Sequence, residues 1–295
     1  MKRSAILFVQ LFILVSYIQA QEIINLYPGK IPNSKQTNII DTGLNLTQGL
    51  IRRSLKPTLQ VFLPEKGKET GTAVVIIPGG SYTVIVYQGE GINTAIELAK
   101  NGIAAFVLKY RLPNDSFVTD KKIGTLQDAQ QAIKLVRENA GKWGIDPKHI
   151  GIMGFSAGGH IASTEATHYK NALIENKNNT SLRPDFQILV YPVISMQDSL
   201  THQDSRNHLL GKGLSKELKD EYSNEMKVED DSPPAYITHA GDDRTVDVDN
   251  SIAYYESLRH HKVPVEMHLY PKGGHGFVFR MKGWMEPLVK WIISL

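Results

Sequence analysis

The sequence predicts an α/β protein with one mostly parallel sheet covered by helices on both faces. Seven short apolar runs, most of them rich in Val, Ile or Leu, have the composition of strands buried on both faces. Five segments with helical patterns lie between or after these runs, and strands that alternate with helices form a parallel sheet. A chain of 295 residues is within the range of a single α/β domain.

The predicted elements follow one another in a regular order. The strands span residues 58–63, 72–77, 103–108, 149–153, 186–191, 235–239 and 265–270. These runs are bounded in turn by Pro64, Pro78, Gly102, Gly154, Pro192, Gly241 and Pro271, residue types that end strands. The helices span residues 91–100, 125–140, 157–169, 248–261 and 283–293.

Two segments do not fit this alternation. Residues 21–57 are rich in Asn, Thr, Pro and Gly, which predicts irregular structure with at most one or two edge strands. Residues 197–231 are long, polar and charged, with a modest helical pattern over 214–222. We interpret residues 197–231 as a small cap inserted over the C-terminal edge of the sheet, within a catalytic domain of residues 21–295.

Residues 1–20 have the pattern of a secretory signal peptide. The basic residues Lys2 and Arg3 precede an apolar stretch, and the small residue Ala20 provides a cleavage site. An N-terminal membrane anchor is the alternative, but the apolar stretch is short for a bilayer span. We therefore expect a protein that is exported, either periplasmic or secreted, without stable insertion into a membrane.

The composition narrows the class of protein. The chain contains no cysteine, which excludes disulfides, a thiolate nucleophile and a zinc–thiolate site. The formal net charge is +3 at pH 7, and two of the positive charges lie in the predicted signal peptide. The nearly neutral remainder gives no indication of binding to nucleic acid or to an anionic membrane surface.

Ser156 lies where a predicted strand becomes a predicted helix. The stretch HIGIMGFSAGGHIAS places Gly154 and Gly158 two residues on either side of it, in the pattern G-x-S-x-G. A nucleophilic hydroxyl at such a turn projects from the sheet edge, and side chains two positions away would collide with neighbouring structure. The helix that follows directs its first N–H groups toward a developing oxyanion, with Ala157 N–H as the nearest donor.

A serine nucleophile needs a general base and a carboxylate that orients the base. His275 follows the last predicted strand in the glycine-rich loop KGGHG, which lets the imidazole reach back across the sheet edge. Asp242 and Asp243 follow the preceding strand in HAGDDRTV. We favour Asp243, which begins the spacing D-x-x-V before the next helix, and Asp242 is the alternative. The chain order Ser, Asp, His is that of the α/β-hydrolase triad.

The remaining part of an acyl-transfer site is a loop of hydrogen-bond donors. The stretch VVIIPGGSYT leaves an earlier strand through two glycines, which let the backbone approach an oxyanion and direct N–H groups at it. Gly80 or Ser81 is the expected donor from this loop, together with Ala157. His160, one helical turn after Ser156, is expected to pack within its helix rather than to take part in catalysis.

These motifs resemble those of α/β-hydrolase serine esterases of the acetylesterase and acetyl xylan esterase type, relatives of hormone-sensitive-lipase-like esterases and prolyl oligopeptidases. The resemblance covers nearly the whole chain after residue 20 and is carried by LYPGKIPNS, IIPGGSY, QDAQQAIKLVRENAGKWGIDPKHIGIMGFSAGGHIAS, SRNHLLG, SPPAYITHAGDDRTV and GGHGF. The family's oxyanion loop is often HGGG or PGGG, and Ser81 replaces the last glycine here. The resemblance implies an α/β-hydrolase fold and deacetylation of plant polysaccharide fragments such as xylo-oligosaccharides.

The expected function is therefore that of a serine esterase that forms an acyl-enzyme on Ser156, needs no cofactor or metal, and acts on a small acylated carbohydrate. A serine peptidase of the prolyl oligopeptidase type shares the triad order, although no clustered acidic pair is placed to hold a peptide N-terminus. A non-catalytic carbohydrate-binding module of the same fold is the second alternative, although such modules typically lose a triad member. The oligomeric state is not predicted.

Overall fold

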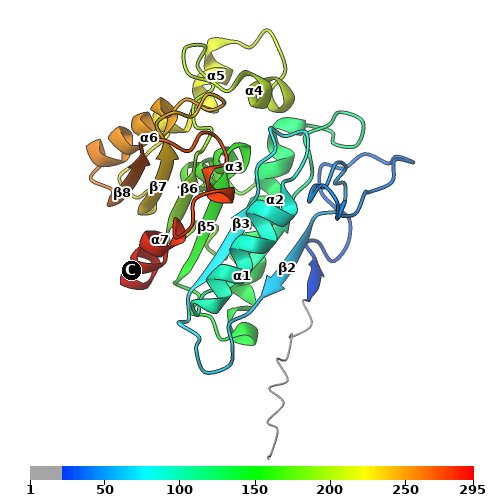
Figure 1. The fold of residues 1–295 in the computed structure, drawn as a ribbon. Helices are drawn as coiled ribbons and strands as arrows, with labels where there is room; N and C mark the ends of the chain where they lie inside the picture. The colour runs from blue at the N-terminus through cyan, green and yellow to red at the C-terminus, as the bar shows by residue number, and fades with distance from the viewer. Residues whose placement is uncertain (1–21) are drawn as a thin grey trace, which may run out of the picture.

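The computed structural model describes residues 22–295, so the predicted signal peptide, residues 1–20, lies outside the described residues. The strands are β1 (Ile23–Asn25), β2 (Thr58–Phe62), β3 (Ala73–Ile77), β4 (Ala104–Lys109), β5 (Ile150–Phe155), β6 (Gln187–Val190), β7 (Ala235–Ala240) and β8 (Val265–Tyr270). They form one sheet of eight strands in the order β1-β2-β4-β3-β5-β6-β7-β8 (Figure 1). Only the pairs β1–β2 and β2–β4 are antiparallel among these described strands. The prediction of a mostly parallel sheet is confirmed.

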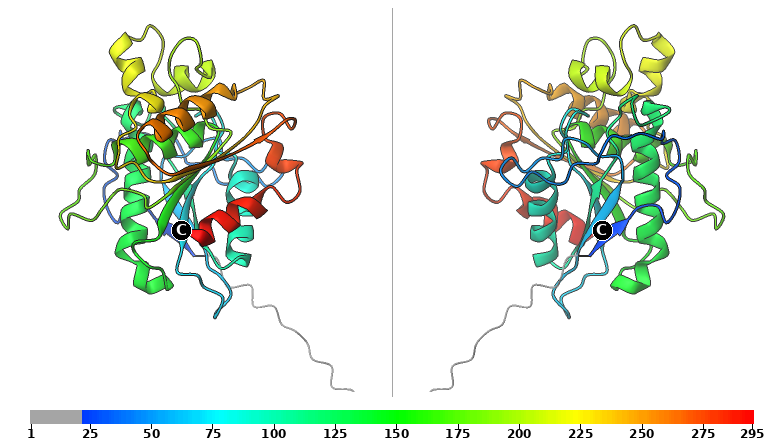
Figure 2. Two further views of the ribbon diagram at one scale, coloured as in Figure 1. Left: turned by 90° about the vertical axis from the view of Figure 1, so that its left-hand side faces the viewer. Right: turned by 90° about the vertical axis from the view of Figure 1, so that its right-hand side faces the viewer.

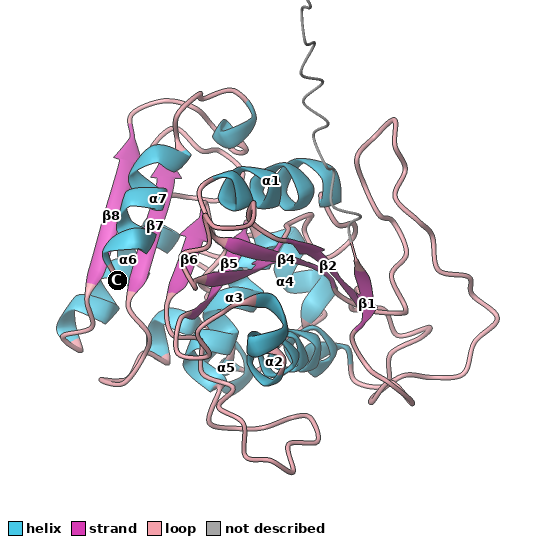
Figure 3. Ribbon diagram, turned by 90° about the horizontal axis from the view of Figure 1, so that it is seen from below, coloured by secondary structure: helices cyan, strands magenta, loops and turns pink. Residues whose placement is uncertain are grey.

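Helices cover both faces of the sheet. The α-helices are α1 (Asn93–Lys100), α2 (Lys121–Glu138), α3 (Ala157–His168), α4 (Gln203–Leu209), α5 (Lys216–Glu221), α6 (Asp249–His260) and α7 (Met285–Ser294). Short 3₁₀ turns are η2 (Ala140–Trp143), η3 (Asn224–Met226) and η4 (Phe277–Phe279). Figures 2 and 3 show α1 on one face of the sheet and α2 and α3 on the opposite face. In Figure 2, α7 lies on the same side of the sheet as α1. The central strands β3 and β5 are buried along their whole length between these layers.

All seven predicted strands and all five predicted helices are present, with shifted ends. The helix predicted over 125–140 begins at Lys121, because the Asp120 side chain accepts a hydrogen bond from Lys122 N–H at 3.1 Å and caps it. The helix predicted over 91–100 begins as a π-helix, η1 (Tyr87–Ile92), that continues into α1. A π-turn within a helix is rare and common at functional sites. In the segment predicted to be irregular, β1 is a single short edge strand.

The segment 197–231, predicted as a cap, contains α4, α5 and η3 and lies above α3 in the view of Figure 1. Asn224 joins it to α3, because its Nδ2 donates to Ser163 Oγ at 2.7 Å and to Thr164 Oγ1 at 3.0 Å. The helix α4 was not predicted. The buried Arg206 of α4 donates from Nη1 to the Met196 carbonyl at 2.8 Å, a contact outside the helix that no local helical pattern indicates.

The carboxyl ends of four parallel strands bring distant segments together. β3 leads into the loop 78–81, β5 into Ser156, β7 into Asp243 and β8 into the loop 271–276. Because parallel strands end at the same sheet edge, residues separated by more than a hundred positions meet there. The fold therefore builds one site from four separate loops.

Candidate active site

Ser156 occupies a strained turn between β5 and α3. Its backbone has φ 51° and ψ −120°, a region that a residue with a side chain adopts only where the surrounding structure enforces it. A Cβ on Gly154 would lie 2.2 Å from Gly158 O, and a Cβ on Gly158 would lie 2.2 Å from Ile77 O. Both distances are steric overlaps, so the two glycines are required for the turn, as their spacing predicts.

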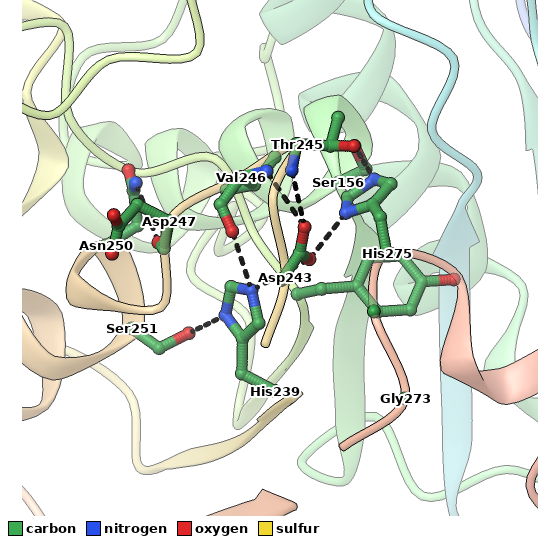
Figure 4. Close-up of polar contacts among 12 residues, drawn as sticks. Ser156, His239, Asp243, Thr245, Val246, Asp247, Asn250, Ser251, Gly273 and His275 are labelled. Atoms are coloured by element: carbon green, nitrogen blue, oxygen red, sulfur yellow. Dashed lines mark hydrogen bonds and ion pairs between the residues drawn. The ribbon is translucent and has the colours of Figure 1, made fainter. Parts of the chain in front are cut away.

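The structure brings Ser156, His275 and Asp243 into a single hydrogen-bonded chain (Figure 4). His275 Nε2 lies 2.9 Å from Ser156 Oγ, and His275 Nδ1 lies 2.7 Å from Asp243 Oδ2. The carboxylate accepts only from a protonated Nδ1, which leaves Nε2 free to accept the serine proton. Ser156 and Asp243 are buried, whereas the His275 side chain is 24% exposed and is open to a leaving group.

Asp243 is saturated with hydrogen bonds. Its Oδ1 accepts from Thr245 N–H at 2.8 Å and from Val246 N–H at 3.1 Å, and its Oδ2 accepts from His239 Nε2 at 3.1 Å as well as from His275. Although burial acts to raise it, the hydrogen bonds from His239 and His275 hold the pKa of Asp243 well below its usual range. The carboxyl is therefore ionised when the imidazole of His275 accepts a proton.

His239 is a functional neighbour that the sequence did not indicate. Its side chain is fully buried, and its Nδ1 lies 2.8 Å from Ser251 Oγ, which fixes the ring that donates to Asp243 (Figure 4). Within the strand pattern of β7 this histidine occupies an ordinary buried position. Its place four residues before the favoured aspartate was the only available signal.

Asp242, the alternative triad acid, contacts the histidine loop instead of the histidine ring. Its Oδ1 accepts a hydrogen bond from Gly274 N–H at 2.7 Å. The guanidinium of Arg280 donates to the carbonyls of Gly273 at 2.5 Å and His275 at 3.1 Å. The loop that carries His275 is thus anchored on both sides.

The loop after β3 packs directly on the nucleophile turn. A Cβ on Gly79 would lie 2.9 Å from Ser156 Cβ, and a Cβ on Gly80 would lie 2.2 Å from Val84 O. The N–H groups of Gly80, Ser81 and Ala157 have no hydrogen-bond partner among residues 22–295. Unpaired donors next to a nucleophile are the geometry that binds an oxyanion.

His160 packs within its helix, as expected, and also holds this oxyanion loop. Its Nδ1 lies 2.8 Å from the hydroxyl of Tyr82, and its Nε2 lies 2.8 Å from the carbonyl of Tyr222 in the cap segment. Tyr82 has φ 63°, and Ser81 has φ 54°, so the loop needs contacts to hold this backbone. Burial lowers the pKa of His160 to about 4, which keeps the imidazole neutral at neutral pH, with Nε2–H donating to the carbonyl.

Replacing His160 by leucine is expected to lower the free energy of unfolding by about 2 to 4 kcal/mol, because it leaves a buried hydroxyl and a buried carbonyl unpaired. Urea denaturation at pH 7 measures this loss. The matched control is His260→Leu at the exposed end of α6, which should change stability by less than about 0.5 kcal/mol. Equal effects of the two substitutions would contradict the assigned contacts of His160.

Glu90 is a second functional neighbour that sequence reasoning missed. It lies in the π-helix η1 and is buried. Its Oε2 accepts from Gly79 N–H at 2.6 Å, and its Oε1 accepts from the Tyr191 hydroxyl at 2.9 Å. Burial raises the pKa of Glu90 to about 7, against the opposing effect of these hydrogen bonds. The segment YQGEGI gives no sign of this role, because the contacts join distant parts of the chain.

Within residues 22–295, no group of three or more His, Asp or Glu side chains is arranged to hold a metal ion. Over the same residues, no helix combines the length and apolar character needed to span a bilayer.

Residues 59–258 of the chain match the model of the BD-FAE family. The chain belongs to the BD-FAE family. The region that matches this family contains the oxyanion loop, Ser156 and Asp243, and His275 follows it within the same sheet-edge site.

This BD-FAE chain is similar in sequence to two proteins whose names refer to xylan. It is 40% identical over 228 residues to an acetylxylan esterase of Xylanibacter ruminicola, covering 76% of this chain and 44% of that protein. It is 37% identical over 205 residues to endo-1,4-beta-xylanase B of Butyrivibrio fibrisolvens, covering 69% of this chain and 32% of that protein. The chain thus spans less than half the length of these two curated relatives.

A solved structure matches the BD-FAE chain over nearly its whole length. The acetyl ester-xyloside bifunctional hydrolase from Caldicellulosiruptor lactoaceticus shares 32% sequence identity, with a TM-score of 0.78 over 92% of this chain and 96% of that chain. This match confirms the α/β-hydrolase fold and the predicted resemblance to acetyl esterases.

Proposed function

We propose that the protein is a serine carboxylic-ester hydrolase that removes acetyl groups from xylan-derived carbohydrates. The observation that carries this proposal is the hydrogen-bonded chain from Ser156 Oγ through His275 to Asp243, beside unpaired backbone donors. The names of the acetylxylan esterase and the acetyl ester-xyloside hydrolase to which the chain is similar support an acetylated xyloside as the substrate.

The geometry supports acyl transfer in two halves. Ser156 Oγ attacks the ester carbonyl while His275 Nε2 takes its proton, and a bond forms between Oγ and the carbonyl carbon. The N–H groups of Ala157 and of Gly80 or Ser81 stabilise the negative oxygen that results. The imidazolium then gives its proton to the departing sugar hydroxyl as the carbon–oxygen bond breaks, which leaves an acetyl group on the serine.

Water completes the reaction by the same route. His275 takes a proton from the water as its oxygen attacks the acyl-enzyme, and returns it to Ser156 Oγ when acetate leaves. Asp243 holds the imidazole in the required tautomer and stabilises its charged form. All of the steps use groups of this chain, the ester and water.

The export of the protein is part of the same proposal. Residues 1–20 have the charge and hydropathy pattern of a signal peptide, and acetylated plant polysaccharide is found outside cells. An exported enzyme would meet its substrate in the periplasm or the medium.

Acetate release from acetylated xylo-oligosaccharides is the decisive test. We expect the protein without residues 1–20 to release acetate from these sugars and to hydrolyse p-nitrophenyl acetate faster than p-nitrophenyl butyrate. Activity on the nitrophenyl esters alone would support the esterase activity and contradict xylan-derived sugars as the substrate. Turnover of aminoacyl-proline amides instead would favour the peptidase, and carbohydrate binding without any turnover would favour a binding module.

A further inference from the structure

The buried carboxylate of Glu90 touches both halves of the active site. On one side, it accepts the N–H of Gly79, the residue before the oxyanion donor Gly80, at 2.6 Å. On the other side, it accepts the hydroxyl of Tyr191, whose ring packs against the ring of His275 with centroids 4.7 Å apart. One side chain thus connects the loop that binds the oxyanion with the ring that moves the proton.

This contact depends on the π-helix η1. The wider π-turn between β3 and α1 places Glu90 beneath the oxyanion loop, where only 4% of the residue is exposed. Tyr110 supports the same loop by donating its hydroxyl to Pro78 O at 2.9 Å. The carbonyl of Pro78 and the N–H of Gly79 are therefore both held by buried side chains.

The charge of Glu90 has one cationic partner in reach. In the described residues, no lysine or arginine forms an ion pair with it. The titratable groups that face it are the hydroxyls of Tyr191 and Tyr110 and the imidazole of His275. The imidazole is cationic once it has taken the serine proton, so it is attracted to Glu90 at the stage at which the tetrahedral intermediate forms.

We propose that Glu90 is a positioning residue of this esterase, whose ionised carboxylate fixes the oxyanion loop through Gly79 and favours the charged form of His275. This inference rests on the proposed function and deepens it. An ionised carboxylate accepts from Gly79 and Tyr191 together, whereas the amide of glutamine presents its NH₂ group to one of these two donors. Glu90→Gln therefore loses one contact as well as the charge.

Steady-state kinetics of p-nitrophenyl acetate hydrolysis test the positioning role. We expect Glu90→Gln to lower kcat by about 10- to 100-fold with little change in KM, because the oxyanion loop loses its support at the point where charge develops. Glu90→Asp keeps the charge and should recover part of the loss. The matched control is Glu97→Gln on the surface of α1. Among residues 22–295 its carboxylate pairs only with Lys100, at 3.1 Å, and its replacement should leave kcat unchanged.

The pH dependence of kcat/KM tests the electrostatic role, which packing alone would not alter. The carboxyl of Glu90 is half ionised near pH 7, and removing this charge disfavours protonated His275, so the acid limb should move to lower pH by less than about 1 unit in Glu90→Gln. Glu90→Asp, which keeps the carboxylate, should keep the wild-type limb. Tyr191→Phe, which leaves Glu90 in place, should give a smaller shift in the same direction and serves if Glu90→Gln does not fold. The proposal would be overturned if the acid limb of kcat/KM did not move in whichever of Glu90→Gln and Tyr191→Phe folds. An unchanged kcat in Glu90→Gln would also overturn it.

Stability provides a readout that needs no turnover. The pKa of Glu90 is raised to about 7, above the value of about 4.3 in an unfolded chain. The native state therefore binds more protons between these values, so Glu90 lowers stability as pH rises from about 4.3 to about 7. The difference in Tm between Glu90→Gln and wild type should grow in favour of the variant over this range, and a constant difference would contradict a raised pKa of Glu90 in the folded protein. If wild type has no serine-dependent activity, the proposed function fails, while this measurement still decides whether burial raises the pKa of Glu90.

Discussion

Ser156→Ala is expected to lower kcat for ester hydrolysis by roughly 10⁴- to 10⁶-fold, because the oxyanion donors and the base remain but no group forms the acyl-enzyme. The change removes one buried oxygen whose hydrogen-bond partner is the His275 ring. Alanine and serine tolerate the φ of 51° at this position equally. Acetate release and p-nitrophenyl acetate hydrolysis, measured with the same preparations, report the loss.

The fold of the Ser156→Ala protein should be unchanged, so its denaturation curve is the control. Residual activity near the wild-type level would contradict Ser156 as the nucleophile. A loss that is confined to the carbohydrate substrate would contradict a shared acyl-enzyme for the two ester types.

Asp243→Asn is expected to lower kcat by about 10⁴-fold, because the amide cannot hold His275 in the tautomer that accepts the serine proton. Four hydrogen bonds converge on this carboxylate, from Thr245, Val246, His239 and His275. An amide oxygen can replace one carboxylate oxygen, but the NH₂ group meets a donor on the other side. The kcat of p-nitrophenyl acetate hydrolysis at pH 8 measures the effect.

Asp242→Asn is the matched control for this prediction. Its amide oxygen can still accept the Gly274 N–H that anchors the histidine loop, so we expect less than about a tenfold loss. If Asp242→Asn proved the more damaging substitution, the assignment of Asp243 as the orienting carboxylate would be wrong.

The parts of the site that could be predicted from sequence are those set by local geometry. Gly154 is required by an overlap within the strand–turn–helix unit, and Gly158 by an overlap with the end of the neighbouring strand β3, so their spacing around Ser156 carries the information. His275 is recognisable from the glycines on both sides, because the loop needs residues that tolerate positive φ. Six of the seven strands were likewise visible as apolar runs because each is short and mostly buried, whereas β8 lies at the sheet edge and is only partly buried.

The parts that could not be predicted depend on contacts between distant segments. Glu90 and Tyr191 are 101 positions apart in the chain, and no local pattern relates them. The choice between Asp242 and Asp243 depends on which way two adjacent side chains point after β7, one toward the Gly274 backbone and one toward His275. Spacing alone could favour one of them but could not place either side chain.

The hydrogen bond from His160 to the Tyr222 carbonyl means that the two ends of residues 197–231, called the cap, should be treated differently in protein engineering. Residues 222–224 are tied to the helix behind the nucleophile through this carbonyl and through Asn224, so they should be kept in any chimaera. Eight residues between Gln203 and Lys219, together with Asp198, line a cavity of about 340 Å³. A library could diversify the residues that line this cavity or replace the residues between 198 and 221 with a relative's segment. Either change would vary the cap and leave in place the contacts of His160 that hold the oxyanion loop.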